Sequence, residues 1–238
     1  MNANKILVVN CGSSSLKYEV YEMPSRVSLG SGSVERVGKS NSRIEQVSTN
    51  GRFVKEQEVS DHEAAVGIMG EALVSEPNGI LGSLDELSGV GHRVVHGGEK
   101  YSESVLIDDE VIAAIDENIE LAPLHNPANL TGIRNVRELL PDKPQVAVFD
   151  TAFHQSLTPS AFLYGLPREL YEKYKIRRYG FHGTSHRFVA TEAVKHVKRS
   201  LDNTNVISCH LGNGASITAI KNGMSIDTSM GFTPLEGL

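Results

Sequence analysis

The feature that most constrains this chain is a unit that occurs twice, once near each end. Near the N-terminus, an apolar stretch over residues 5–10 enters the small-residue turn 11–14 and returns over residues 16–22. Near the C-terminus, the same plan recurs in SCHLGNGASITAI. Each copy is typical of a strand, a tight turn and a returning strand. The repetition predicts a duplicated fold with one such loop in each half.

Both loops are suited to binding a phosphate. Glycine-rich turns expose backbone N–H groups and let an anion approach closely. The first loop adds serine hydroxyls, the Asn10 amide and the Lys17 ammonium, and the second has His210 beside it. A plain hairpin explains the first loop equally well, and a lone histidine is more often structural. Because the plan recurs in both halves, we favour phosphate binding.

The rest of the chain alternates strands with helices. We predict further strands over residues 31–37, 43–48, 53–59, 89–96, 145–149 and within 206–227, with Asn50-Gly51 as a hairpin turn. We predict helices over residues 61–75 with Asp61 as N-cap, 108–121, from Asn126 as N-cap with Pro127 next, 159–174 and 184–201. This order predicts α/β or α+β layering, with one domain over residues 1–150 and a second beginning at 151–238.

Composition argues against several functions. The 23 Lys and Arg against 29 Asp and Glu give a net charge of −6, whereas nucleic-acid and membrane-surface binders carry a basic excess. Cys11 and Cys209 are too few for a disulfide framework, so a reducing cytoplasm is expected. No apolar run approaches the roughly 18 residues of a membrane span, and no signal sequence is expected.

Arg93 stands in the segment GHRVVHGG, which has the composition of a buried strand. Strand alternation predicts Arg93, Val95 and Gly97 on one face. A buried arginine is costly unless it meets an anion, and its planar fork suits a phosphate or carboxylate. The alternative is a structural salt bridge.

Two more polar residues, His182 and Asp150, are candidates for contact with a phosphoryl group or its metal ion. His182 lies between glycines in RRYGFHGTSH, where it could donate to a phosphoryl oxygen, while Thr184 or Ser185 could cap the next helix. Asp150 ends a predicted strand, where a carboxylate can hold Mg²⁺ or its water. An ordinary turn aspartate is the alternative.

Six segments, taken together, resemble the acetate kinase family in the family's order: VVNCGSSSLKY, GHRVVHGGEKY, LAPLHNPAN, VFDTAFH, RRYGFHGTSH and SCHLGNGASITAI. The resemblance implies the α/β fold of the acetate/sugar kinase, chaperone and actin superfamily, with duplicated ribonuclease-H-like domains, the second incomplete here. It implies reversible transfer of the ATP γ-phosphoryl group to acetate, giving acetyl phosphate and ADP. A propionate kinase, a non-catalytic ATP-binding module and an inactive fragment are the rivals.

The resemblance also implies roles for individual residues. Three are catalytic, Arg93 also holding the acetate carboxylate: Arg93, His182 and Asp150. The first loop contributes Asn10, Ser15 and Lys17, with Asn10 as a Mg²⁺ ligand and Asp150 as a second holder through water. The second loop binds nucleotide phosphates through His210, Gly212, Asn213 and Gly214. The acetate methyl pocket is implied at Val95, Leu124, Phe181 and Pro234.

Members of that family are longer than 238 residues. Their second catalytic arginine, adenosine-binding segment and a late acidic Mg²⁺ residue fall beyond Leu238. We therefore expect the 238 residues alone to be inactive. For the intact enzyme, the resemblance implies a cytoplasmic homodimer that uses ATP or ADP with Mg²⁺ or Mn²⁺, acts on acetate or acetyl phosphate, and has no nucleic-acid or membrane partner.

Overall fold

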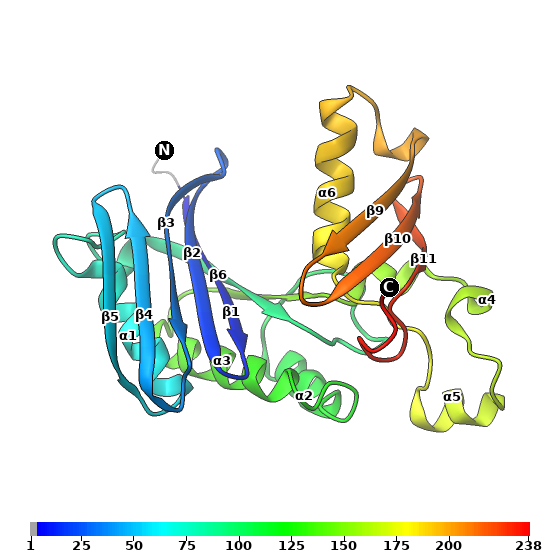
Figure 1. Cartoon of the computed structure of the whole chain (residues 1–238), viewed down its shortest axis with the longest axis horizontal. Coiled ribbons are helices and arrows are strands. Elements are labelled where there is room, and N and C mark those ends of the chain that lie inside the picture. The colour runs from blue at the N-terminus through cyan, green and yellow to red at the C-terminus, as the bar shows by residue number, and fades with distance from the viewer. Residues whose placement is uncertain (1–3) are drawn as a thin grey trace. The chain divides into compact units, whose positions relative to one another are not determined.

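The structure, a computed structural model, describes residues 4–238, which form two compact units (Figure 1). The first unit contains residues 4–94, Val105–Ile119 and Pro123–Ala147. The second contains Val95–Ser104, Glu120–Ala122 and Val148–Leu238. The chain passes between them several times, so neither unit is one continuous stretch.

The first unit is built on an eight-stranded sheet whose order is β5-β4-β3-β2-β1-β6-β8-β7. Its strands are β1 (Asn4–Gly12), β2 (Ser15–Met23), β3 (Val27–Glu35), β4 (Lys39–Ser48), β5 (Gly51–Val59), β6 (Leu87–Val94), β7 (Val105–Leu106) and β8 (Gln145–Phe149). Strands β1 to β5 form the predicted antiparallel meander, and β6 lies parallel to β1. The sheet is therefore mixed.

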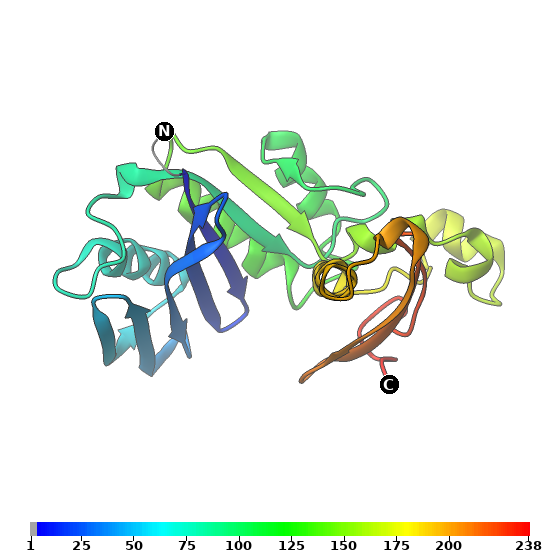
Figure 2. The same ribbon diagram turned by 90° about the horizontal axis from the view of Figure 1, so that it is seen from above.

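Helices cover one face of this sheet. They are α1 (His62–Val74) and α3 (Asn126–Leu139), with α2 (Asp109–Glu117) beside α3. In β1, period-two alternation buries Leu7, Val9 and Cys11 toward these helices. The helical repeat of α3 contributes Val136 to the same core. Figure 2 shows α1 (cyan) and α3 (green) on the same side of the blue strands.

The predicted start of α1 is confirmed, whereas the predicted position of the hairpin turn before it is wrong. Asp61 is the N-cap, and its Oδ1 accepts from the Ala64 N–H at 2.9 Å. The hairpin turn consists of Thr49 and Asn50, because Ser48 pairs with Gly51. The predicted turn Asn50-Gly51 is thus wrong by one residue, and Gly51 supplies a positive φ of 138° at the start of β5.

The helices predicted over 108–121 and 184–201 end earlier, at Glu117 and His196, and two further helix predictions are wrong. Asn126 is the first residue of α3 and not its cap, because its side chain is buried and donates to the Ile115 carbonyl at 3.1 Å. The single helix predicted over 159–174 is two helices, α4 (Pro159–Phe162) and α5 (Arg168–Tyr174). Pro167 separates them, since it lacks an N–H and disfavours helical backbone in the preceding residue.

The predicted strand over 89–96 ends early. Strand β6 stops at Val94, and Val95 already belongs to the second unit. The predicted common face of Arg93, Val95 and Gly97 is therefore wrong, because alternation does not continue past the strand. A Cβ on Gly97 would lie 2.6 Å from the Phe149 ring, so close packing and not strand geometry requires this glycine.

The second unit has a three-stranded antiparallel sheet of β9 (Asn205–Leu211), β10 (Ala215–Lys221) and β11 (Met224–Thr228). Helix α6 (Gly183–His196) packs on it, and the 3-10 segment η2 (Ala152–Ser156) packs on β11. Polar side chains line the buried side of this sheet: Ser208, Ser216, Thr218, Ser225 and Thr228. On β9, Ile207 and Leu211 are 68% and 73% exposed.

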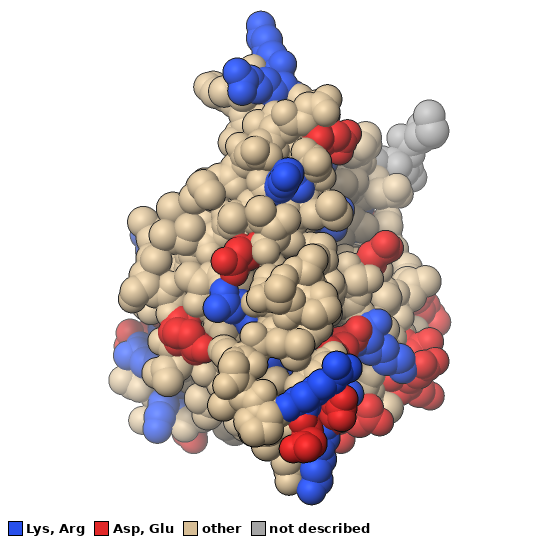
Figure 3. All heavy atoms as spheres, turned by 90° about the vertical axis from the view of Figure 1, so that its right-hand side faces the viewer, with Lys and Arg blue, Asp and Glu red and all other residues tan. Residues whose placement is uncertain are grey.

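Within the described residues, no helix is long and apolar enough to cross a membrane. On the face drawn in Figure 3, basic and acidic side chains are interspersed, and surface without either covers much of the area. The remaining short elements are the 3-10 segments η1 (Leu84–Glu86) and η3 (Leu201–Asn203).

Truncating Ile133 to alanine should lower the free energy of unfolding by about 2–5 kcal/mol, the range for deleting a large core side chain. Ile133 is fully buried on α3. Glu138→Ala is the matched control, because Glu138 is exposed on the same helix. Urea denaturation measures both variants, and equal midpoints would contradict the packing of α3 against the sheet.

Candidate functional site

In the first unit, three predicted site residues gather at one end of neighbouring strands. Asn10 on β1 pairs with Lys17 on β2, and Val9 pairs with His92 on β6, next to Arg93. The Arg93 Nη1 donates to the Asn10 Oδ1 at 3.3 Å. This places a guanidinium, an amide and an ammonium beside the first loop.

Side-chain donors from two helices hold the first loop. The His62 Nε2 donates to the Gly12 carbonyl at 2.7 Å, and the Asn129 Nδ2 donates to the Cys11 carbonyl at 2.7 Å. Ser13 and Ser14 form the two-residue turn between Gly12 and Ser15. The sequence analysis did not single out His62 or Asn129, because nothing near them in the chain indicates which distant carbonyl they meet.

In the second unit, His182 stands where β8 and α6 meet. It is the N-cap residue of α6 with a φ of 57°. The next residue, Gly183, donates its N–H to the Asp150 carbonyl at 2.9 Å, and a Cβ on Gly183 would lie 2.4 Å from that oxygen. Only glycine allows this approach, so this backbone contact places His182 next to Asp150, the residue that follows β8.

Asp150 is buried, at 3% exposure, and the Thr184 Oγ1 donates to its Oδ1 at 3.4 Å. Thr184 and Ser185 lie inside α6, whose N-cap makes no side-chain hydrogen bond. The alternative in which one of them caps the helix is therefore wrong. The Ser185 hydroxyl instead lies 2.8 Å from the His210 Nδ1.

The second loop lies against His182. Leu211 pairs with Ala215, which leaves Gly212, Asn213 and Gly214 as the loop, in agreement with the predicted hairpin. The His182 and His210 rings stack with centroids 3.9 Å apart and an interplanar angle of 25°. A Cβ on Gly214 would lie 3.3 Å from the His182 Nε2.

Two buried histidines that the sequence analysis missed support this region. Burial lowers the pKa of His154 to about 4, so this ring is neutral. Its Nε2 lies 2.9 Å from the Phe181 carbonyl, which only accepts, and its Nδ1 lies 2.9 Å from the Ser225 hydroxyl. The second histidine is His186, whose pKa burial also lowers to about 4. Only the tertiary structure brings these rings next to His182.

The residues implied for a methyl pocket are only partly brought together. Val95 and Phe181 form a buried apolar cluster with Met230, which the sequence analysis missed. Leu124 belongs to the first unit and is 75% exposed, and Pro234 is exposed in the second. The four-residue pocket stays a prediction.

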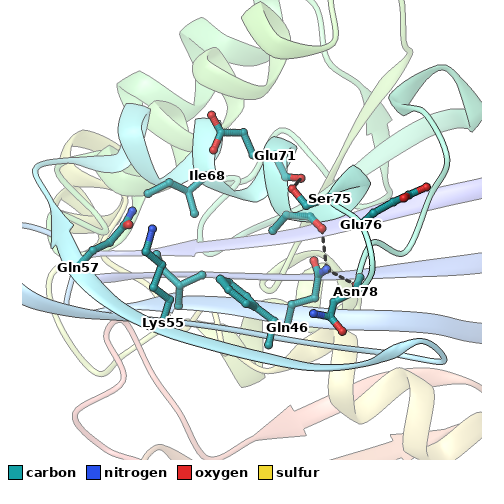
Figure 4. Close-up of a pocket in the computed structure, with 11 residues that line it drawn as sticks. Gln46, Lys55, Gln57, Ile68, Glu71, Ser75, Glu76 and Asn78 are labelled. Atoms are coloured by element: carbon teal, nitrogen blue, oxygen red, sulfur yellow. Dashed lines mark hydrogen bonds between the residues drawn. The ribbon is translucent and has the colours of Figure 1, made fainter.

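A cavity of about 290 Å³ lies elsewhere in the first unit, between α1 and strands β4 and β5 (Figure 4). None of the predicted site residues lines it. Gln46 is the buried polar side chain in its lining. Its Nε2 donates to the Ala72 and Asn78 carbonyls, at 2.6 and 2.9 Å. The Gln46 Oε1 also accepts from the Tyr18 hydroxyl at 2.8 Å, so Gln46 is committed to the fold.

Comparison with known proteins identifies the family of this chain. The sequence model of the Acetokinase family matches residues 5–238, and the chain belongs to that family. An acetate kinase of Desulfitobacterium hafniense (strain DSM 10664 / DCB-2) is 56% identical over 235 residues, which are 98% of this chain. The family resemblance inferred from the motifs is confirmed.

Solved structures show the same fold. The crystal structure of Porphyromonas gingivalis acetate kinase superposes with a TM-score of 0.94 and 48% identity, covering 99% of this chain. A propionate kinase from Francisella tularensis subsp. tularensis SCHU S4 superposes with a TM-score of 0.92 and 43% identity, again covering 99%. The predicted fold class is confirmed. The chain spans 59% of the length of each of these three proteins.

The stability of this chain should fall as the pH falls from about 6.5 to 4. Burial lowers the pKa to about 4 in four histidines: His92, His96, His154 and His186. In this window the unfolded chain binds protons that the folded chain does not. The free energy of unfolding therefore falls as acid is added. Urea denaturation across the window measures this, and a flat free energy of unfolding would contradict neutral buried histidines.

Proposed function

We propose that this chain carries the phosphate- and carboxylate-binding parts of an acetate kinase, which transfers the ATP γ-phosphoryl group reversibly to acetate. The observation that carries the proposal is the contact between His182 and the second loop, where the ring stacks on His210 and lies beside Gly214. The relatives at 48–56% identity named as acetate kinases support the choice of reaction.

The chemistry requires charge neutralisation more than proton transfer. A carboxylate such as acetate, comparable to a model Glu with a pKa of about 4.3, is ionised at neutral pH and needs no general base. One carboxylate oxygen bonds to the γ-phosphorus while the bond to the bridging oxygen of ADP breaks. Arg93 and His182 are proposed to stabilise the phosphoryl oxygens, which carry the charge during transfer.

The oxygen atoms of Asp150 and Asn10 suit a metal ion that binds together with the nucleotide. Among the described residues, no group of three or more His, Cys, Asp or Glu is placed to hold a metal ion. Mg²⁺ usually keeps several waters and binds through one or two carboxylates plus substrate phosphates, and Mn²⁺ accepts the same oxygen ligands. We propose that the Asp150 carboxylate holds a water of such an ion, and that Asn10 offers an amide oxygen. The ion supplies positive charge to the phosphates.

The finer proposals rest on family membership. We propose that the intact enzyme uses ATP or ADP with Mg²⁺ or Mn²⁺, forms a homodimer and is located in the cytoplasm. We also propose that these 238 residues are inactive alone. The large exposed apolar side chains of β9, Ile207 and Leu211, support that proposal, because contiguous exposed apolar surface usually marks an interaction face.

The reaction can be tested with a chimera. It joins this chain to the part of the Desulfitobacterium hafniense acetate kinase that its 59% coverage leaves unmatched. We expect acetyl phosphate from the chimera and none from the chain alone. An active chain alone would reject the proposed incompleteness. A folded chimera that hydrolyses ATP without forming an acyl phosphate would favour the non-catalytic ATP-binding class.

In the chimera, Arg93→Ala should reduce kcat by about 10²–10³-fold, as for removal of a donor that stabilises charge in the transition state. Arg134→Ala is the control, since Arg134 is exposed on α3 of the same unit. Steady-state acetyl phosphate formation measures both. A near-normal rate for Arg93→Ala would remove Arg93 from the mechanism.

A propionate kinase is the second candidate, supported by the Francisella tularensis structure at a TM-score of 0.92. The ratio of kcat/KM for acetate and propionate decides between the two. Val95→Ala should change this ratio in favour of propionate, because the smaller side chain leaves room for one more methylene. One methylene changes discrimination by about 1–3 kcal/mol, so we expect a partial change in preference. Val189→Ala, at an exposed valine of α6, is the control. An unchanged preference would exclude Val95 from the substrate pocket.

A further inference from the structure

Ser216 is a fully buried serine whose hydroxyl lies between two histidines. Its Oγ is 2.9 Å from the His182 Nδ1 and 2.7 Å from the His186 Nε2. A hydroxyl has one proton and two acceptor lone pairs, and accepting from both rings would leave this buried O–H without an acceptor, so it donates to one ring and accepts from the other. Ser216 therefore couples the proton positions of His182 and His186.

The coupling continues to a second serine. The His186 Nδ1 lies 3.0 Å from the Ser208 Oγ, and Ser208 is 3% exposed. Ser208 is on β9, Ser216 is on β10 and His186 is on α6, so a sheet and the helix that packs on it hold all three groups. His186 is neutral because burial lowers its pKa to about 4, and it therefore carries a single N–H.

When both rings are neutral, each carries one N–H, and two directions make both Ser216 contacts hydrogen bonds and satisfy the Ser216 O–H. In one direction, Ser208 donates to His186, His186 donates to Ser216, and Ser216 donates to the His182 Nδ1. In the reverse direction, each of these bonds points the other way, and the His186 Nδ1–H donates to the Ser208 Oγ.

Ser208 decides between the two directions. In the part of the chain that the structure describes, the only hydrogen-bond partner of its side chain is the His186 Nδ1. The reverse direction would use that contact to accept, and the buried Ser208 O–H would then have no acceptor. A buried donor without an acceptor loses its hydrogen bond to water and gains none in return, which disfavours the reverse direction. The first direction leaves no such group.

We propose that Ser208, His186 and Ser216 form a directional hydrogen-bond relay that makes the His182 Nδ1 an acceptor and so places the proton of the neutral ring on Nε2. Nε2 is the nitrogen beside Gly214, in the second loop. The three residues are positioning residues. They set which atom of His182 can donate a hydrogen bond toward an anion at that loop, and this consequence rests on the proposed phosphoryl transfer.

The relay itself can be tested without any activity. In the 238-residue chain labelled with ¹⁵N in its imidazoles, the His182 and His186 signals are assigned from His182→Gln and His186→Gln variants. The spectra are recorded well above the ordinary imidazole pKa of about 6.5. We expect a protonated Nε2 and an unprotonated Nδ1 in both rings. A proton on Nδ1 of either ring would overturn the proposal, and a proton on Nδ1 of both would mean the reverse direction.

Removing the relay should change the His182 ring. Ser216→Ala deletes the donor to Nδ1, and Ser208→Ala deletes the first donor without touching His182. Both should bring the two His182 nitrogen shifts closer together, because the second tautomer becomes populated. Ser225→Ala is the matched control, since this buried serine contacts His154 instead. Unchanged His182 shifts in both relay variants would overturn the proposal, and Ser208→Ala decides alone if Ser216→Ala does not fold.

In the active chimera, Ser216→Ala should lower kcat about 10- to 100-fold with a smaller effect on the KM for ATP, as seen when partners that orient metal-binding histidines are removed. If the His182 nitrogen shifts change as expected but kcat does not fall, the relay stands and the role of His182 in phosphoryl transfer is rejected. The spectra and the kinetics thus separate failure of the relay from failure of the proposed function.

Discussion

The organisation of the second unit depends on one backbone hydrogen bond, from the Gly183 N–H to the Asp150 carbonyl at 2.9 Å. It joins the end of β8 to the start of α6 at a distance that any side chain at position 183 would prevent. Asp150 and His182 are adjacent because of this contact. Once α6 begins there, its first turns bring Ser185 to His210 and His186 to the two serines of the sheet.

The two units differ in the chemistry of their interiors. The first has a mainly apolar core of strand and helix side chains, with a few hydrogen-bonded polar groups such as Gln46 and the His92–Gln145 pair. In the second, serine and threonine hydroxyls on the sheet meet histidines of α6 and η2. Buried polar groups are costly unless all are hydrogen-bonded, so such an interior specifies one arrangement of side chains. That property suits a region proposed to hold reacting groups in place.

Much of the fold could be predicted from local pattern. The buried strand over residues 5–10 and the buried stripe of α3 follow from apolar pattern, and the Asp61 cap follows from the chemistry of its side chain. The errors arose where tertiary contacts override local preference. Asn126 has the chemistry of a cap, yet its amide satisfies a carbonyl of α2. Gly97 continues an apparent alternation, yet its close contact with Phe149 is what requires a glycine.

The amino-acid sequence by itself determined the family, the two glycine-containing hairpins and the candidate residues Arg93, Asp150, His182 and His210, because these lie in contiguous motifs. Only the tertiary structure decided that Ser216 lies between His182 and His186, and that Ser208 lies on the far side of His186. It also brought His154 to the Phe181 carbonyl, and Met230 to Val95 and Phe181. The physical reason is that a hydrogen bond or an apolar contact depends on distance in space. A buried serine on one strand therefore carries no local mark of the histidine that it will meet.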